Sequence, residues 1–281
     1  MLLAGGMGLL SGCGSAGPEM VEGEVLSVDQ TRHLIVLREE GGAERTFVVE
    51  PVYARWAQAG SRIRGELRDG GEEEYPGLGS IWPADPAAER AMASFNRRLQ
   101  QDTIIHGTGA FREIGETVSE FALFNERGQV VTPQDWRGQR ILINFIFTRC
   151  LDASMCPAAT RLMRETQRLA AEREVEDLRF LSVTLDPAYD TPAILFDYAR
   201  AYGIDLDNFS FLTGPDEAIR DLMLQLGLLR EQDEREIWRH SVATVLLDPQ
   251  RRVLFRTTSK TWSPEEIIRL LQRDRETEEE G

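Results

Sequence analysis

Residues 141–147 constrain the fold more than any other segment, because Ile-Leu-Ile-Asn-Phe-Ile-Phe is an almost unbroken apolar run. A run of this length is typical of a strand that is buried on both faces. Residues 180–185 and 209–212 repeat the pattern. Strands of this kind occur in sheets that are covered by helices on both sides. The sequence therefore predicts an α/β architecture for this part of the chain.

The segments between these runs predict helices. After Cys156 and Pro157, apolar residues fall on one stripe of a helix whose other faces carry Arg and Glu. Further helices are expected over about 192–202, 216–226 and 264–273, and a hairpin is expected from strands at 242–247 and 253–256. Alternating strands and helices, followed by a hairpin and a last helix, predict a thioredoxin-like fold with a central mixed sheet.

The first part of the chain has a different pattern. Short runs of alternating polar and apolar residues, separated by Gly and Asp turns, predict a small all-β module that is OB-like in size. We expect a linker with a bracing helix from Pro86 to about Gln101. The expected organisation begins with a signal and tether at 1–18, a β-barrel-like module at 19–68 and a linker at 69–110. A thioredoxin-like domain at 111–275 and a charged tail at 276–281 follow.

The formal net charge of −15 excludes some classes of partner. Nucleic acids and anionic lipid headgroups are bound by basic surfaces, so neither is expected to be the main partner of this chain. A basic protein partner fits the charge better.

The first residues are apolar and small, and Leu10-Ser11-Gly12-Cys13 resembles the lipobox of bacterial lipoproteins. That resemblance implies lipidation at Cys13 and a membrane-anchored protein outside the cytoplasm, on the periplasmic face. No Lys or Arg precedes Cys13, which departs from the usual positively charged start of such signals. The alternative is an apolar N-terminus with an incidental cysteine.

Cys150 and Cys156 lie between the most apolar strand and the amphipathic helix. Pro157 suits the first position of a helix, which places Cys156 at the N-cap. There the helix dipole is expected to lower the pKa of the thiol and favour a thiolate. Thiolates serve both disulfide exchange and the binding of soft metals. The alternative is a pair of buried structural cysteines.

His240 precedes the strand that begins the predicted hairpin. In a thioredoxin-like fold this junction faces the cysteine corner, so we expect His240 to join Cys150 and Cys156. Two thiolates and an imidazole form a soft, three-coordinate set that suits Cu(I). Zn(II) usually takes a fourth ligand, and none is evident.

Residues 111–273 resemble the SCO/SenC proteins, which deliver copper to cytochrome c oxidase. The resemblance rests on four ordered motifs: Phe-Thr-Arg-Cys…Cys-Pro at 147–157, Asp-Pro-Ala-Tyr-Asp-Thr-Pro at 186–192, Phe-Leu-Thr-Gly at 211–214 and His-Ser at 240–241. It implies that Cys150, Cys156 and His240 bind copper, as Cu(I) with Cu(II) left open. Asp186 and Asp190 would then support the site or act as ordinary strand-end and N-cap acids. The implied partner is the copper-bearing subunit of the oxidase or another copper acceptor.

Two features depart from known copper proteins. Five residues separate the two cysteines here, whereas the family usually has three, and Met155 in this longer loop could supply a thioether. The N-terminal module resembles small periplasmic copper-binding barrels, but it offers only His33 and Met20 as metal ligands. We therefore expect the module to bind no metal.

Three functions compete. The favoured hypothesis is a copper chaperone, because a plain dithiol exchanger has no need of His240. The second is a thiol–disulfide oxidoreductase that uses Cys150 and Cys156 on the cysteines of a copper-site protein or of another extracytoplasmic protein, which the long loop favours. The third is a peroxidase, in which Thr148 and Arg149 would activate Cys150.

Overall fold

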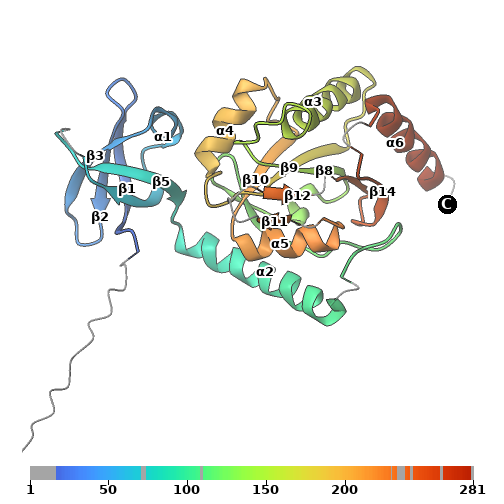
Figure 1. Cartoon of the computed structure of the whole chain (residues 1–281), viewed down its shortest axis with the longest axis horizontal. Helices are drawn as coiled ribbons and strands as arrows, with labels where there is room; N and C mark the ends of the chain where they lie inside the picture. The colour runs from blue at the N-terminus through green and yellow to red at the C-terminus, as the bar shows by residue number, and fades with distance from the viewer. Residues whose placement is uncertain are drawn as a thin grey trace, which may run out of the picture.

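The computed structural model describes residues 17–70, 74–107, 110–228, 230–232, 238–240, 243–259 and 262–279. For 230–232, 238–240 and 274–279 it describes the backbone alone. A small barrel and a larger α/β domain lie side by side, and helix α2 runs from the barrel along the lower side of the α/β domain (Figure 1).

The barrel is a closed sheet with the strand order β1-β2-β3-β5-β4. Its elements are β1 (Met20–Asp29), β2 (Leu34–Glu39), β3 (Glu44–Val49), α1 (Pro51–Trp56), β4 (Arg62–Arg68) and β5 (Gly77–Pro83). This order, with a helix between the third and fourth strands, is that of an OB fold and confirms the predicted all-β module. Alternate side chains point inward, including the fully buried Val25, Ile35, Phe47 and Ile63.

The barrel extends further than the sequence analysis placed it. Strand β5 lies within residues 69–110, which were assigned to the linker. It pairs with β4 in antiparallel and with β3 in parallel orientation, and so closes the barrel. Its sequence, Gly-Leu-Gly-Ser-Ile-Trp-Pro, hides the alternation because its two core side chains, Leu78 and Ile81, are three residues apart, with Ser80 at a φ of 46° between them.

Helix α2 (Pro86–His106) fastens the barrel to the α/β domain. The Asn96 amide donates to the carbonyl oxygen of Ala122 at 2.8 Å and accepts from its N–H at 2.9 Å. Near the other end of the helix, the Asp102 carboxylate accepts from Gln225 Nε2 at 2.8 Å and pairs with the guanidinium of Arg112. The predicted bracing helix is present and continues for five residues beyond Gln101.

The α/β domain is built on a seven-stranded sheet in the order β14-β13-β8-β9-β10-β6-β7. The strands are β6 (Leu123–Asn125), β7 (Val130–Val131), β8 (Arg140–Ile146), β9 (Leu178–Thr184), β10 (Phe209–Thr213), β13 (Thr244–Leu247) and β14 (Val253–Thr257). The central strands β8, β9 and β10 are parallel to one another, and β6 and β13 flank them in antiparallel orientation. The mixed sheet confirms the predicted thioredoxin-like class.

Helices cover both faces of this sheet. They are α3 (Cys156–Glu172), α4 (Pro192–Ala201), α5 (Asp216–Gln225) and α6 (Pro264–Glu279). Side chains of α3, α4 and α6 share one apolar cluster with one face of the sheet, and side chains of α5 and α2 share a second cluster with the other face. Helix α6 includes most of the predicted charged tail, since Glu and Arg favour helical backbone.

The barrel packs against the α/β domain through α1. Ala193, at the start of α4, is fully buried in the apolar cluster of the barrel together with Tyr53 and Ala54. Trp56 Nε1 donates to the carbonyl oxygen of Glu126 at 2.9 Å, and Arg55 pairs with Asp197 at 2.9 Å. The barrel therefore rests on the segment that directly follows Asp190.

Candidate metal centre

Cys150 and Cys156 lie in the connection between β8 and α3, at the C-terminal end of a central strand. Strand β8 lies between β13 and β9, so the connection emerges from the middle of the sheet. Helix α3 begins at Cys156, with Met155 as its N-cap and Pro157 in its first turn. The helix thus starts one residue earlier than predicted, and Cys156 occupies its first position.

The two thiols interact with each other but differ in exposure. Cys156 is 2% exposed, Cys150 is half-buried, and both contact the apolar cluster beneath α3. Both are free thiols. Burial is the main cause that raises the pKa of the Cys156 thiol, and a hydrogen bond with the Phe147 backbone acts against it. The neighbouring Cys150 raises it further.

The predicted fall in the pKa of Cys156 is therefore wrong. A helix start does favour a thiolate, but the thiol lies among apolar side chains, where the loss of hydration of the charged form outweighs the dipole.

The five residues between the cysteines fold into a hydrogen-bonded turn. The Asp152 carboxylate accepts from the backbone N–H of Ser154 at 2.8 Å and from its hydroxyl at 2.6 Å. The Asp152 carbonyl oxygen accepts from the Met155 N–H at 3.0 Å and lies 3.8 Å from Cys150 Sγ. The longer loop therefore folds back and allows the two thiols to meet. Met155 is half-buried, and Leu151 is almost fully exposed.

Asp190 holds the backbone that leads into Cys150. Its carboxylate accepts from the Thr148 N–H at 3.1 Å, from the Thr148 hydroxyl and from the Thr184 hydroxyl at 2.5 Å. The side chain is fully buried. Burial raises the pKa of this carboxyl to about 6, although the three hydrogen bonds oppose the shift. Asp190 thus joins the ends of β8 and β9 two residues before Cys150.

Asp186 forms a second link to the same turn. Arg149 Nη2 donates to Asp186 Oδ2 at 2.5 Å, and the guanidinium stacks over the ring of Tyr189 at 4.1 Å. The pKa of Arg149 is raised because the hydrogen bond to Asp186 favours the charged form. The structure therefore brings Asp186 and Asp190 together with the residues that precede Cys150.

The sequence analysis missed the hydroxyl partners of this network. Thr148 and Arg149 were considered only as activators of a peroxidatic cysteine, and Thr184 was not singled out. Their positions at the ends of β8 and β9 could have revealed them, because the C-terminal ends of adjacent parallel strands meet at one edge of a sheet.

His240 was predicted to precede the first strand of the hairpin, and it does precede β13, with its backbone in a separate pair of short strands. Strand β12 (Trp238–His240) is antiparallel to β11 (Arg230–Gln232), and His240 pairs with Arg230. The imidazole of His240 lies outside the described side chains, as Cys13 lies outside the described residues. Among the groups that are described, no three His, Cys, Asp or Glu side chains are arranged to hold a metal ion.

The SCO1/SenC family profile matches residues 110–274, which is more than half of the chain. The chain belongs to the SCO1/SenC family. The match begins after α2 and ends within α6, so it covers the α/β domain and leaves the barrel outside.

Relatives and solved structures agree with this assignment. The chain is 31% identical over 179 residues to the mitochondrial SCO2 homolog of Bos taurus, an alignment that covers 62% of each protein. A SCO1/SenC family lipoprotein of Bacillus anthracis superposes with a TM-score of 0.53 at 26% identity, over 58% of this chain and 98% of that one. BsSco, described with a disulfide switch and as a member of the Sco family of cytochrome c oxidase assembly proteins, has a TM-score of 0.50 at 26% identity, over 58% and 96%.

The SCO1/SenC match accounts for only part of the chain and part of its relatives. The chain spans 62% of the length of the bovine relative, and its N-terminal barrel lies outside the family match. Within the described residues, no helix combines the length and the apolar character that a membrane crossing needs.

Proposed function

We propose that this protein is a copper chaperone that binds Cu(I) through Cys150, Cys156 and His240. The observation that carries the proposal is the contact between two free thiols at the start of α3, in a domain of the SCO1/SenC family. Thiolates are soft ligands, and soft ligands select Cu(I) over hard cations. The copper-bearing subunit of cytochrome c oxidase is the proposed acceptor, in line with the assembly role given for BsSco.

The geometry suits a metal that is passed on by ligand exchange. Cys150 is half-buried on an open turn, whereas Cys156 is enclosed beneath α3. A ligand from an acceptor therefore reaches the Cys150 side of the site first, while Cys156 retains the metal. Binding must displace the proton of Cys156, because a thiol coordinates as the thiolate and burial keeps this thiol protonated. Copper affinity is expected to increase with pH.

A Cu(I) titration in competition with a chelator tests the proposal. The reduced protein is compared with its Cys150→Ala, Cys156→Ala and His240→Ala variants. We expect one tight equivalent of Cu(I) that each substitution weakens. Absence of tight Cu(I), with a readily formed Cys150–Cys156 disulfide instead, would refute the chaperone and assign the cysteine pair to thiol–disulfide exchange.

We also propose that a lipid on Cys13 anchors the protein to the membrane, with its domains on the periplasmic face. Support comes from the lipobox-like residues 10–13 and from the B. anthracis relative, which is described as a lipoprotein. Mass spectrometry of the protein from a bacterial membrane fraction is expected to find a lipidated Cys13 as the first residue. A Cys13→Ser variant that stays equally membrane-bound would contradict the anchor.

A further inference from the structure

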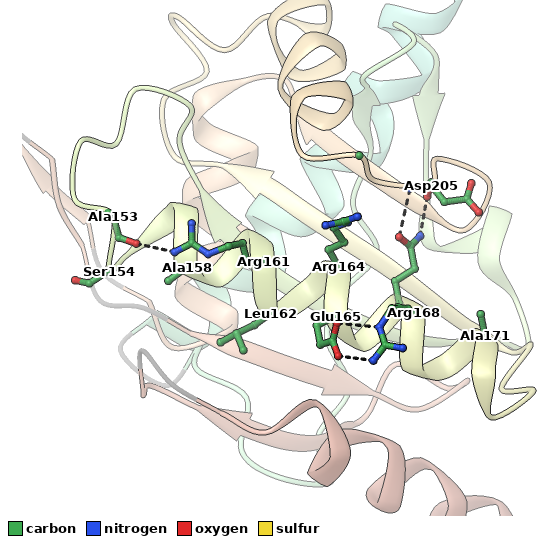
Figure 2. Close-up of a pocket in the computed structure, with 12 residues that line it drawn as sticks. Ala153, Ser154, Ala158, Arg161, Leu162, Arg164, Glu165, Arg168, Ala171 and Asp205 are labelled. Atoms are coloured by element: carbon green, nitrogen blue, oxygen red, sulfur yellow. Dashed lines mark hydrogen bonds and ion pairs between the residues drawn. The ribbon is translucent and has the colours of Figure 1, made fainter.

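A groove of about 850 Å³ runs along the outer face of α3, beginning at the turn between the two cysteines. Ala153 and Ser154 form its first wall, Arg161 and Arg164 line its middle, and Asp205 lies at its far end (Figure 2). Both wall residues belong to the five-residue spacer between Cys150 and Cys156. The groove therefore begins at the loop that joins the two cysteines.

The groove gathers positive charge in a protein whose net charge is −15. Arg161, Arg164 and Arg168 line it from successive turns of α3. Arg168 is already occupied, because it pairs with Glu165 at 2.6 Å and with Glu172. Within the described part of the chain, neither Arg161 nor Arg164 forms an ion pair, and both side chains are exposed. Two guanidinium groups are thus available to an anionic ligand.

Arg161 also connects the groove to the cysteine turn. Its Nη2 donates to the carbonyl oxygen of Ala153 at 3.1 Å, and Figure 2 shows this side chain extended toward the turn. A guanidinium has five N–H donors, so Arg161 can hold Ala153 and still bind a carboxylate. A carboxylate bound there would lie beside the segment that joins the two cysteines.

The rest of the lining is mixed: Ala158, Leu162 and Ala171 are apolar, Gln167 is polar, and the carboxylates are those of Glu165, paired with Arg168, and of Asp205 at the far end. A surface with apolar patches between unpaired guanidiniums is complementary to a chain segment that carries carboxylates and a few apolar side chains. We propose that this groove is a docking site for an acidic segment of the protein that exchanges copper with the cysteine pair. The identity of that partner rests on the proposed function, and the groove rests on the geometry above.

Fluorescence polarisation tests the groove without any metal. The probe is a fluorescein-labelled peptide of about twelve residues that contains several glutamates and two leucines, and its counterpart has lysine in place of glutamate. The acidic peptide is expected to bind, more weakly as salt increases, and at least about fivefold more weakly to Arg161→Ala/Arg164→Ala. The matched control is Arg90→Ala/Arg97→Ala, which removes the same charge from exposed positions of α2 and is expected to change the affinity less than about twofold.

The variant Arg161→Lys/Arg164→Lys distinguishes an effect of lost positive charge from an effect of lost folded structure. This variant retains the positive charge and is expected to bind the peptide with intermediate affinity, and circular dichroism checks that each variant is folded. Equal binding of the acidic peptide to wild type and to Arg161→Ala/Arg164→Ala would overturn the proposal. Equal binding of the lysine peptide, or competition by free glutamate at the concentration at which the peptide itself competes, would overturn it as well.

A second measurement tests whether the groove belongs to the cysteine turn. Saturating acidic peptide is expected to slow the alkylation of Cys150 by iodoacetamide at least about twofold in wild type and not in Arg161→Ala/Arg164→Ala. Peptide that binds without slowing alkylation would overturn docking beside the cysteines. Since neither assay contains copper, their failure leaves the Cu(I) titration unaffected, and failure of that titration leaves the groove assays interpretable.

Discussion

The barrel and the α/β domain bury different kinds of side chain. Among the described residues of the barrel, the buried ones are apolar or aromatic residues and glycines. The α/β domain buries charged groups, including Glu126, Arg140, Asp186, Asp190 and Asp248. Burying a charge is costly unless it is paired or hydrogen-bonded. Each of these five groups has a hydrogen-bonded or oppositely charged partner that offsets this cost.

Two of these buried acids lie at the cysteine turn. Asp186 and Asp190 hold Arg149 and Thr148, which directly precede Cys150. The barrel has no comparable polar cluster in its described interior, and it meets the segment after Asp190 through an apolar contact with Ala193 and an exposed ion pair between Arg55 and Asp197. The comparison teaches that chemistry is concentrated in the α/β domain, while the barrel supports the backbone behind Asp190.

The largest expected difference between the two regions is in how much a substitution in each of them weakens Cu(I) binding. Cys156→Ser is expected to weaken Cu(I) binding by about a thousandfold or more, or about 4 kcal/mol, because it removes the enclosed ligand. Met20→Leu combined with His33→Asn removes the candidate metal ligands of the barrel and is expected to change the affinity less than about twofold. Asn suits position 33 because His33 has a φ of 55°. Competition titration measures both, and loss of copper from the barrel variant would break the comparison.

Asp190 predicts a pH dependence that comes from the α/β domain. Its pKa is raised from 3.8 to about 6 in the folded protein, so folding takes up a proton between these values. The contribution is fully present below about pH 4 and is lost as the pH rises through 6, a change of about 3 kcal/mol in the free energy of unfolding. Urea unfolding at pH 4.5 and pH 7, a window that contains about 2 kcal/mol of this change, is expected to show that Asp190→Asn removes this part of the dependence. An unchanged pH profile in the variant would assign it to other groups.

Gly128 tests the contact between the regions. It has a φ of +78°, and a Cβ there would lie 2.7 Å from Trp56 Cζ2 and 2.9 Å from Pro83 Cγ, both in the barrel. Gly138 has a φ of +82° with open space around it, so Gly138→Ala reports backbone strain alone. We expect Gly128→Ala to be less stable than Gly138→Ala by about 2 kcal/mol. Equal losses in thermal unfolding would show that the barrel is not seated on this turn.

The smallest expected effect is at the rim of the same contact. Arg55 and Asp197 form an ion pair across the interface, but both side chains are substantially exposed. Exposed ion pairs contribute about 0–1 kcal/mol, so Arg55→Ala is expected to change the free energy of unfolding by less than about 0.5 kcal/mol. A loss comparable with that of Gly128→Ala would mean that charge, more than apolar packing, joins the two regions.

Most of the α/β domain could be predicted from the sequence because its signals are local. The apolar run at 141–147 and the stripe on α3 specify a buried strand and a covering helix without knowledge of their neighbours. Strand β5 escaped prediction because its core residues Leu78 and Ile81 break the period of two, and only pairing with β3 and β4 identifies it.

The candidate site was predictable in position and less so in chemistry. Cys150 and Cys156 could be identified from their place between a strand and a helix, and the structure brings them together. The direction in which the pKa of Cys156 shifts could not be predicted, because it depends on apolar side chains from several elements that enclose the thiol. The groove could not be predicted either, because it forms only where the 151–155 turn packs beside α3.

The contact of Trp56 with the 125–128 turn also bears on how the chain is made. Domains generally fold from the N-terminus during synthesis, and the barrel is complete once Pro83 has emerged. Its partners Gly128, Ala193 and Asp197 are synthesised tens of residues later. Until these residues emerge, Trp56 on the nascent barrel lacks its packing partners. We expect the 125–128 turn and the start of α4 to fold against the barrel once they are synthesised.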